Sequence, residues 1–323
     1  MIKVKICLIG GTGRSGTTIL SKILSKHQYV SDVPELRYIV DPDGIIDFYT
    51  SCQQWSPYHY DLKLKRLESI LRDVSTTGFG KTIAAYVAYP LKKLPWKLRP
   101  RYYGISVTRY CAGFQENVRE LIQQLSAFSF HGEWIGLGAF KSKCLQYGYP
   151  PDKDDLRRII GNFLRSIFYQ ILQEQNVEHY LEKNTWNHIW FDKILELLPE
   201  ARIVHIQRDP RDVVSSYCNQ SWMPTNPEQS AIILRDLLRR WEIVKQKVPA
   251  NSFFEISLEQ LVTRPEATLK QICDFYGLDW DDNLMNVNLS KSNQGRWKKH
   301  FTPEQQKRIH SILAEDIARL GYE

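Results

Sequence analysis

The chain has 323 residues, of which 43% are apolar and 12% aromatic, so it can fill the core of a large globular protein. Its net charge of +7 is modest and its basic residues are scattered among acidic ones, which fits a small, highly anionic ligand at least as well as a nucleic acid. We therefore expect no nucleic-acid partner.

The cysteine spacing and the hydropathy pattern narrow the possible class of protein further. The six cysteines are far apart and include no C-x-x-C pair, so the sequence indicates neither a disulfide framework nor a zinc site. No stretch approaches the roughly 18 apolar residues of a membrane span, and the first residues do not resemble a secretory leader. We expect a cytoplasmic protein with reduced thiols, no membrane span and no metal.

The first predicted element is a buried strand from Val4 to Ile9, an apolar run rich in β-branched residues. Apolar residues at helical spacing follow up to Leu24, and a loop with four glycines, Gly10 to Thr18, lies between the two. A strand, a glycine-rich turn and a helix start present backbone N–H groups and the positive end of the helix dipole to a ligand. The stretch therefore predicts a phosphate-binding loop.

This loop nearly fits the pattern G-x-x-x-x-G-K-[ST] of nucleotide-binding proteins, with Gly11, Gly16 and Thr18 in register. Thr17 stands where the pattern has a lysine that reaches the β- and γ-phosphates, and Arg14 is the only cation of the loop. We expect the loop to hold the 5′-phosphate end of a nucleotide that has no γ-phosphate. The alternative is an ordinary glycine-rich turn.

Residues from about 50 to 175 are predicted to form a helical insertion. Helical periodicity covers residues 116–128 and 152–173, and the second of these helices has an acidic first turn. Residues 49–100 show no clear pattern, and their chemistry is not assigned. The turn-rich segment 32–43 lies near the place where a second strand would be expected.

After residue 179 the pattern alternates between strands and helices. Strands are predicted at 202–207 and 253–256, and a short strand with its exit loop at 179–184. Helices are predicted at 226–247 and 265–276, the end of a helix at 191–198, and a turn that starts a helix at 208–217. This alternation indicates an α/β fold of the P-loop NTPase type, with a central parallel sheet flanked by helices, and ligands of such sheets bind at the carboxyl ends of the strands. We expect one domain over residues 1–323.

Three stretches carry a family resemblance: GRSGTT at residues 13–18, HIQRDPRDVVSSY at 205–217 and GRWKKHFT at 295–302. Together they resemble the sulfotransferases that use 3′-phosphoadenosine 5′-phosphosulfate (PAPS). The resemblance covers the first 40 residues and about 179–308, and leaves the middle third unmatched. It implies that the first loop holds the 5′-phosphosulfate, through Gly13, Arg14, Ser15, Gly16, Thr17 and Thr18.

The second and third stretches would complete the nucleotide site. The resemblance implies that Arg208 and Ser216, eight residues apart, hold the 3′-phosphate, for which a charged fork and a helix start are suited. Taken alone, Arg208 could instead form a surface salt bridge with Asp209 or Asp212. The resemblance also implies a segment that closes over the nucleotide, formed by Gly295, Arg296 and Lys298, with Trp297 packed beneath.

Two residues would carry the chemistry. Lys183 in LEKNTWN resembles the lysine that points to the transferred group, although an exposed lysine without a function is the alternative. Cytosolic members place a histidine base close after that lysine, and here Asn184, Thr185 and Trp186 follow. Glu35 instead resembles the base of the protein-tyrosine and carbohydrate branch, or it only pairs with a loop arginine. His131 and His188 are further candidates for the base.

The resemblance implies sulfuryl transfer from PAPS to an acceptor hydroxyl, with 3′,5′-ADP as the product. The acceptor could be a small molecule, a carbohydrate or a peptide, and the insertion would lie on its side of the protein. Its aromatic residues could line the acceptor pocket or belong to the core: Trp55, Tyr58, Tyr60, Tyr102, Tyr103 and Trp134. A P-loop kinase or NTPase and a binding protein without catalysis are the alternatives, and the sequence indicates no oligomeric state.

Overall fold

The computed structural model describes residues 4–75, 102, 105–134, 144–287 and 294–322. The chain divides into two compact units, which are described separately below. The first unit comprises residues 1–5, 33–180 and 196–199, and the second comprises 6–32, 181–195 and 200–323. The prediction of one domain over residues 1–323 stays a prediction.

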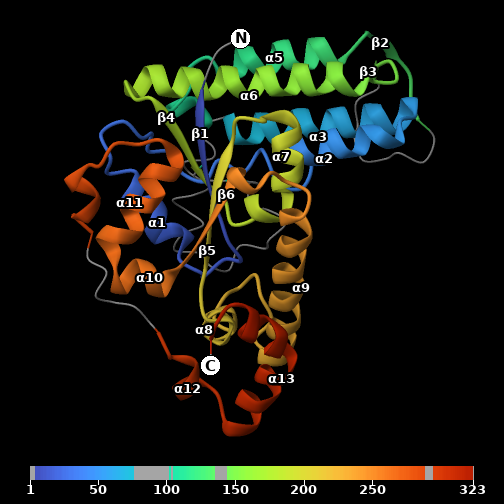
Figure 1. The fold of residues 1–323 in the computed structure, drawn as a ribbon. Coiled ribbons are helices and arrows are strands. Elements are labelled where there is room, and N and C mark those ends of the chain that lie inside the picture. The colour runs from blue at the N-terminus through green and yellow to red at the C-terminus, as the bar shows by residue number, and fades with distance from the viewer. Residues whose placement is uncertain (1–3, 76–101, 103–104, 135–143, 288–293, 323) are drawn as a thin grey trace, which may run out of the picture. The chain divides into compact units, whose positions relative to one another are not determined.

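The second unit contains most of a parallel sheet with the strand order β4-β1-β5-β6. These strands span His179–Lys183 (β4), Lys5–Gly10 (β1), Arg202–Gln207 (β5) and Phe253–Ser257 (β6). β5 pairs in parallel with both β1 and β6 (Figure 1). The predicted α/β class with a central parallel sheet is confirmed.

One face of the sheet packs against α1 (Thr17–Leu24), α10 (Leu258–Thr263) and α11 (Pro265–Tyr276) (Figure 1). Alternate strand residues such as Ile9, Val204 and Ile256 join apolar residues of these helices in one buried cluster. Successive side chains of a strand point to opposite faces, which is why every second residue enters this cluster. The phosphate loop is thereby anchored on both sides by buried elements.

The other face packs against α9 (Pro227–Lys245), whose Trp241 stacks on His205 of β5 with 4.6 Å between the ring centroids. Because helices cover both faces of the sheet, its strands are buried on both sides and are apolar along most of their length. α9 also packs with α8 (Pro210–Tyr217) and α13 (Pro303–Arg319) around a second apolar cluster. The C-terminal helix α13 is not among the predicted elements.

Helix boundaries in this unit follow local chemistry. Asn226 caps α9 by accepting hydrogen bonds from the N–H groups of Glu228 and Gln229, and Pro227 occupies the first turn. α11 begins at Pro265 and ends at Tyr276, and the following residue, Gly277, caps it in a left-handed conformation with φ of 71°. The remaining short elements are η4 (Asn187–Trp190), α7 (Phe191–Leu197), η5 (Ala250–Ser252), η6 (Asp282–Met285) and α12 (Trp297–His300).

The first unit is mainly helical, as predicted for its central segment. Its helices are α2 (Ile45–Ser51), α3 (Pro57–Ser75), α5 (Phe114–Leu125) and α6 (Lys153–Gln175), with the short turns η1 (Cys52–Gln54) and η3 (Val107–Arg109). α6 begins where its cap residue Asp152 accepts two backbone N–H groups. Residues 76–100 of the unassigned segment 49–100 lie outside the described residues.

Two features of this unit differ from the expectation. A 19-residue helix, α3, lies in a segment that shows no clear pattern in the sequence. Residues 128–131 form the strand β2 (Phe128–His131), which pairs antiparallel with β3 (Cys144–Tyr147), so the predicted helix ends three residues early. Strand pairing over this distance depends on contacts that local periodicity does not record.

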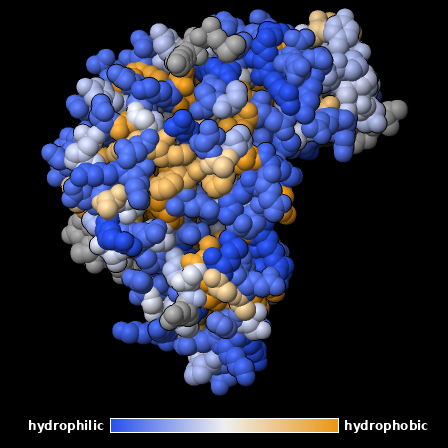
Figure 2. All heavy atoms as spheres, viewed as in Figure 1, coloured by the Kyte–Doolittle hydropathy of each residue, from blue (hydrophilic) through white to orange (hydrophobic). Residues whose placement is uncertain are grey.

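The face in view in Figure 2 is mainly hydrophilic, and the cysteines form no cross-links. Figure 2 shows that hydrophilic residues cover most of the face in view, with small groups of hydrophobic residues between them. Within the described ranges, no helix has both the length and the apolar character needed to cross a bilayer. The six cysteines, all of which lie in these ranges, form no disulfide.

Candidate active site

The loop after β1 has the backbone conformation of an anion-binding turn. Gly13 and Gly16 have φ angles of 77° and 112°, and Arg14 between them has φ of 58°. Gly16 is the cap residue of α1, and no side chain caps that helix. The first-turn N–H groups of α1 and its positive dipole end are therefore left to a ligand.

Close packing explains the glycine at position 11. A Cβ atom there would lie 2.5 Å from Ser15 Oγ and 2.6 Å from the carbonyl oxygen of Ile206, so a side chain does not fit. Ser15 and Thr17 are buried, whereas Arg14 and Thr18 are exposed. The buried hydroxyl of Ser15 has no hydrogen-bond partner among the residues the structure describes. A polar atom buried in this way is suited to a ligand that supplies the missing hydrogen bond.

The second predicted stretch lies against this loop. Arg14 donates from Nε to Ser216 Oγ over 2.8 Å, and Arg208 donates to the carbonyl oxygen of Arg14 over 3.4 Å. The structure thus brings together three predicted ligand residues that are up to 202 positions apart. Arg208 also forms a salt bridge of 3.4 Å with the buried carboxylate of Asp212, which is the alternative left open for Arg208.

The third predicted stretch is fastened to α8 by the same carboxylate. Asp212 accepts hydrogen bonds from the backbone N–H groups of Gly295 (2.7 Å) and Trp297 (3.1 Å). The guanidinium of Arg211 lies over the Trp297 ring at 4.4 Å, so the packing role of Trp297 involves α8. Arg296 and Lys298 are exposed, and their role in closing over a nucleotide stays a prediction.

Lys183 is the last residue of β4, at the sheet edge from which the phosphate loop emerges. The next residue, Asn184, donates its backbone N–H to the carbonyl oxygen of Ile9 over 3.3 Å, and Asn187 donates its side-chain amide to the same oxygen over 3.2 Å. Both bonds fix the end of β4 beside the end of β1. Lys183 itself is half-buried.

Glu35 lies in the first unit and pairs with Arg37, with 3.3 Å between Oε1 and the guanidinium. Arg37, whose φ is 68°, also reaches Asp41 at 3.5 Å, and Tyr102 donates to that second carboxylate. Burial raises the pKa of Asp41, and the charge of Arg37 opposes this shift. The pairing alternative for Glu35 is therefore present, and its role as a base stays a prediction.

The two histidines named as alternative bases differ in exposure. His131 lies on the exposed strand β2 of the first unit. His188 is fully buried, and burial holds its pKa well below the usual range, with His205 adding to the effect. Its Nδ1 lies 2.9 Å from the carbonyl oxygen of Thr185. These contacts indicate a structural role for His188.

The sequence analysis gave no role in the nucleotide site to three residues of this region, Asp212, Tyr217 and Trp222, and named Asp212 only as a possible salt-bridge partner of Arg208. The Tyr217 hydroxyl donates to the carbonyl oxygen of Thr12 in the phosphate loop. The half-exposed ring of Trp222 lies against Gly13. For Asp212 and Tyr217 a signal exists, because both lie in the stretch that carries the resemblance. Asp212 lies four residues before Ser216, so the two share one side of the helix, and Tyr217 directly follows Ser216. For Trp222 the sequence offers none.

The charges at the carboxyl ends of β1, β4 and β5 favour the binding of an anion. Arg14 lies in the loop, Arg208 contacts it, and Lys183 ends the neighbouring strand. The Asp212 carboxylate, which contacts Arg208, also accepts two backbone N–H groups. In the part of the chain that the structure describes, no group of three or more histidine, cysteine or acidic side chains could hold a metal ion. The basic side chains and the backbone N–H groups of the loop are suited to phosphate groups.

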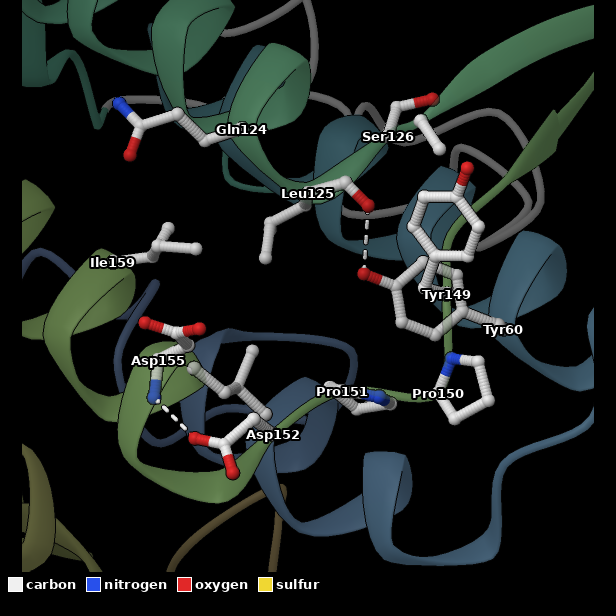
Figure 3. Close-up of a pocket in the computed structure, with 12 residues that line it drawn as sticks. Tyr60, Gln124, Leu125, Ser126, Tyr149, Pro150, Pro151, Asp152, Asp155 and Ile159 are labelled. Carbon is white, nitrogen blue, oxygen red and sulfur yellow. Dashed lines mark hydrogen bonds between the residues drawn. The ribbon is translucent and has the colours of Figure 1, made fainter.

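The first unit contains a separate pocket of about 430 Å³, shown in Figure 3. Tyr60, one of the aromatic residues named above, lines it and donates its hydroxyl to the carbonyl oxygen of Leu125 over 2.8 Å. Asp152 and Asp155 lie at the helix start on the opposite side (Figure 3). No residue predicted to bind the nucleotide or to act in catalysis lines this pocket.

The other aromatic residues of the middle third divide between packing and surface. Trp55 contacts Tyr147, and Tyr58 contacts Trp134, both edge to face. Tyr102 donates to Asp41, and Tyr103 lies outside the described residues. An acceptor pocket formed by the whole set stays a prediction.

Comparison with known proteins gives consistent matches. The model of a family described as "Sulfotransferase family" matches residues 109–282, just over half of the chain. This range includes Lys183, Arg208 and Ser216, and excludes the first loop and residues 295–298. Two curated proteins, each named omega-hydroxy-beta-dihydromenaquinone-9 sulfotransferase Stf3, from Mycobacterium bovis and Mycobacterium tuberculosis, are 22% identical over 190 residues. The match covers 54% of this chain and 48% of each relative, so the chain spans about half the length of the curated relatives it matches.

Among solved structures, the sulfotransferase STF9 from Mycobacterium avium has a similar fold. The TM-score is 0.50 at 13% identity, and the alignment covers 100% of this chain and 78% of STF9. At this identity the likeness concerns the fold alone, and it agrees with the parallel sheet and flanking helices described above.

Proposed function

Because the chain belongs to the sulfotransferase family, we propose that it transfers the sulfuryl group of PAPS to a hydroxyl group of an acceptor. The acceptor oxygen forms a bond to sulfur, and the bond between sulfur and the bridging oxygen of the 5′-phosphate breaks. 3′,5′-ADP leaves with that electron pair, and the hydroxyl proton passes to a base. The products are a sulfate ester and 3′,5′-ADP.

The loop after β1 is suited to the 5′ end of the nucleotide. The uncapped start of α1, the positive φ angles of Gly13 and Gly16 and the buried hydroxyl of Ser15 all favour a bound anion. A sulfuryl group carries one negative charge, which fits a loop with Thr17 in place of a lysine. In this proposal residues 13–18 hold the phosphosulfate.

The hydrogen bond between Arg14 and Ser216 is the observation that carries the proposal. It joins the phosphate loop to the strand-turn-helix that the resemblance assigns to the 3′-phosphate, and Arg208 touches the same loop. PAPS has phosphates at both positions, and a nucleoside triphosphate has none at the 3′ position. Two basic loops side by side therefore favour PAPS over ATP.

Lys183 and Glu35 are proposed as the catalytic residues. A charge from Lys183 at the bridging oxygen stabilises the transition state more than the ground state, because negative charge develops there as the bond breaks. Removing one such donor typically costs about 2.7 to 4 kcal/mol in the barrier. Glu35 would accept the hydroxyl proton, and this role rests on the resemblance alone.

Residues 295–298 are proposed to close over the nucleotide. Their attachment to α8 through Asp212 supports this role, because α8 also carries Ser216. The curated relatives are named for a hydroxylated menaquinone derivative, which supports a small-molecule hydroxyl as the acceptor here. We propose that class of acceptor without assigning the molecule.

A thermal-shift comparison tests the donor. 3′,5′-ADP at about 100 times its dissociation constant should stabilise the protein by roughly 2.7 kcal/mol, and ATP with magnesium should have a much smaller effect. Equal stabilisation by ATP would contradict the proposal and favour an NTPase. Arg208→Ala should remove most of the preference for 3′,5′-ADP over 5′-AMP. Arg235→Ala, on α9, should leave it unchanged, because Arg235 pairs with Asp236.

A further inference from the structure

Trp222 lies in the loop that follows α8 and is partly exposed. Its side chain is 49% exposed, although its ring touches the phosphate loop: one ring carbon lies 3.1 Å from the position that a Cβ of Gly13 would take. Thr185, two residues after Lys183, lies at the same distance from that position. Trp222 therefore lies where the phosphate loop meets the exit of β4.

Two aromatic neighbours hold Trp222 in this place. Its ring meets Tyr217 edge to face at 5.5 Å between centroids, and it meets Trp186 at 6.4 Å with an interplanar angle of 85°. Trp186 is fixed in turn, because its backbone N–H donates to Asn184 Oδ1 over 2.9 Å. Edge-to-face pairs of this kind are favourable beyond the area they bury, and here they keep a large apolar face in water.

The sheet order indicates which part of the reactants this face would meet. β1 lies between β4 and β5, and the residues proposed for the 3′-phosphate follow β5. Trp186 instead follows β4, on the side of Lys183, where the proposed reaction places the transferred group and its acceptor. We propose that Trp186 and Trp222 form an apolar wall of the acceptor site and select a hydroxyl carried on a flat, apolar ring. This inference rests on the proposed function.

The polar groups near the wall argue against a sugar. A sugar ring needs several hydrogen-bond partners beside the aromatic face that it stacks on. The hydroxyl of Tyr217 already donates to the carbonyl oxygen of Thr12, and the carbonyl oxygen of Thr185 already faces His188 Nδ1. The two rings therefore offer mainly apolar area, which suits a phenol or a ring-bearing alcohol.

The test uses 2-naphthol as a flat apolar acceptor and N-acetylglucosamine as a polar one, both with PAPS. Wild-type protein should sulfate 2-naphthol with the higher kcat/KM. Trp222→Ala should raise the KM for 2-naphthol at least tenfold. In Trp222→Phe the KM should return most of the way to the wild-type value. The KM for PAPS and the Kd for 3′,5′-ADP should change less than twofold. Trp280→Ala, at a tryptophan that contacts Lys270 on another part of the second unit, serves as the matched control.

A second measurement separates acceptor binding from turnover. Calorimetry with 2-naphthol and protein saturated with 3′,5′-ADP should show weaker binding for Trp222→Ala and an unchanged affinity for Trp280→Ala. If Trp222→Ala weakens 3′,5′-ADP and not 2-naphthol, Trp222 is a nucleotide contact and the inference is wrong. Preference for N-acetylglucosamine would likewise overturn it. If the wild-type protein does not bind 3′,5′-ADP, the proposed function itself fails, and the inference fails with it.

Discussion

At the residue scale, Lys183 and Glu35 differ in the contacts that hold them in place. Lys183 ends β4 beside the strand that feeds the phosphate loop, because Asn184 and Asn187 both bind the carbonyl oxygen of Ile9. Glu35 has a partner of its own in Arg37. The two residues therefore need different experiments.

Lys183→Ala should lower kcat by about 10² to 10³, the usual effect of removing one preorganised donor to a developing charge. The Kd for 3′,5′-ADP should change less than threefold, because the proposed contact strengthens only as the bridging oxygen becomes negative. Steady-state kinetics and calorimetry measure the two quantities. Lys193→Ala on α7 is the matched control, and a mutant with normal kcat but weak nucleotide binding would place Lys183 in ground-state binding.

Glu35→Gln should lower acceptor-dependent kcat by about 10² or more if Glu35 accepts the proton, and nucleotide affinity should stay unchanged. Arg37→Gln is the informative companion, because it removes the ion pair and leaves the carboxylate. If Glu35 served only this ion pair, the two variants would show the same small loss of activity and the same change in melting temperature.

At the element scale, α8 is the helix that holds the proposed nucleotide site together. Ser216 and Tyr217 contact the phosphate loop, and Asp212 binds the backbone at residues 295 and 297. Ser215 adds a contact of 2.8 Å to His300. Residues spaced three or four apart share one side of a helix, so a single helix can reach both segments.

Asp212→Asn should release residues 295–300 from α8, because the amide has only one oxygen to accept the two backbone N–H groups. A buried donor left without a partner costs about 1 to 3 kcal/mol, so nucleotides with a 3′-phosphate should bind about tenfold more weakly. Trypsin should also cleave after Arg296 and Lys298 faster than in the wild type. The control Asp236→Asn, on an exposed carboxylate, should alter neither result, and unchanged cleavage in Asp212→Asn would contradict the assignment.

At the scale of the whole molecule, a buried polar cluster on one face of the sheet should make folding sensitive to acid. Burial lowers the pKa of His205, and it holds that of His188 well below the usual range. The Glu255 carboxylate lies 3.4 Å from His205 Nδ1 and accepts the Trp241 indole N–H. Burial alone would raise the pKa of Glu255, but His205, Trp241 and Lys245 together lower it to about 2.

The sign of the effect follows from the histidines. Each binds a proton in the unfolded chain near pH 6.5 and in the folded chain only at lower pH, so folding stability is fully present above this value and falls as the pH drops below it. The slope should approach about 1.4 kcal/mol per pH unit for each histidine that stays neutral. The free energy of unfolding by urea, measured at pH 7.5 and 5.5, gives this slope. His205→Gln should flatten the dependence and His310→Gln, on an exposed residue, should not; a flat wild-type profile would show that the histidines are not held neutral.

The sequence by itself determined the alternation of strands and helices after residue 179 and the strand-loop-helix at the start. The physical reason is that these elements have local causes: β-branched apolar runs fill a sheet that is buried on both faces, and residues such as Pro265 and Gly277 start and stop helices through their own backbone preferences. The same local patterns carried the family resemblance, while the roles it implies for single residues stay predictions.

Only the tertiary structure decided the rest. The buried face of α3 includes the polar residues Asp61 and Ser75 beside its apolar ones. β2 pairs with β3 across residues that no local pattern joins. The contacts of Asp212 with residues 295 and 297, and of Trp222 with Gly13, join segments more than 80 positions apart. Such contacts depend on how the chain returns to one edge of the sheet, and sequence periodicity records only which face of its own element a residue occupies.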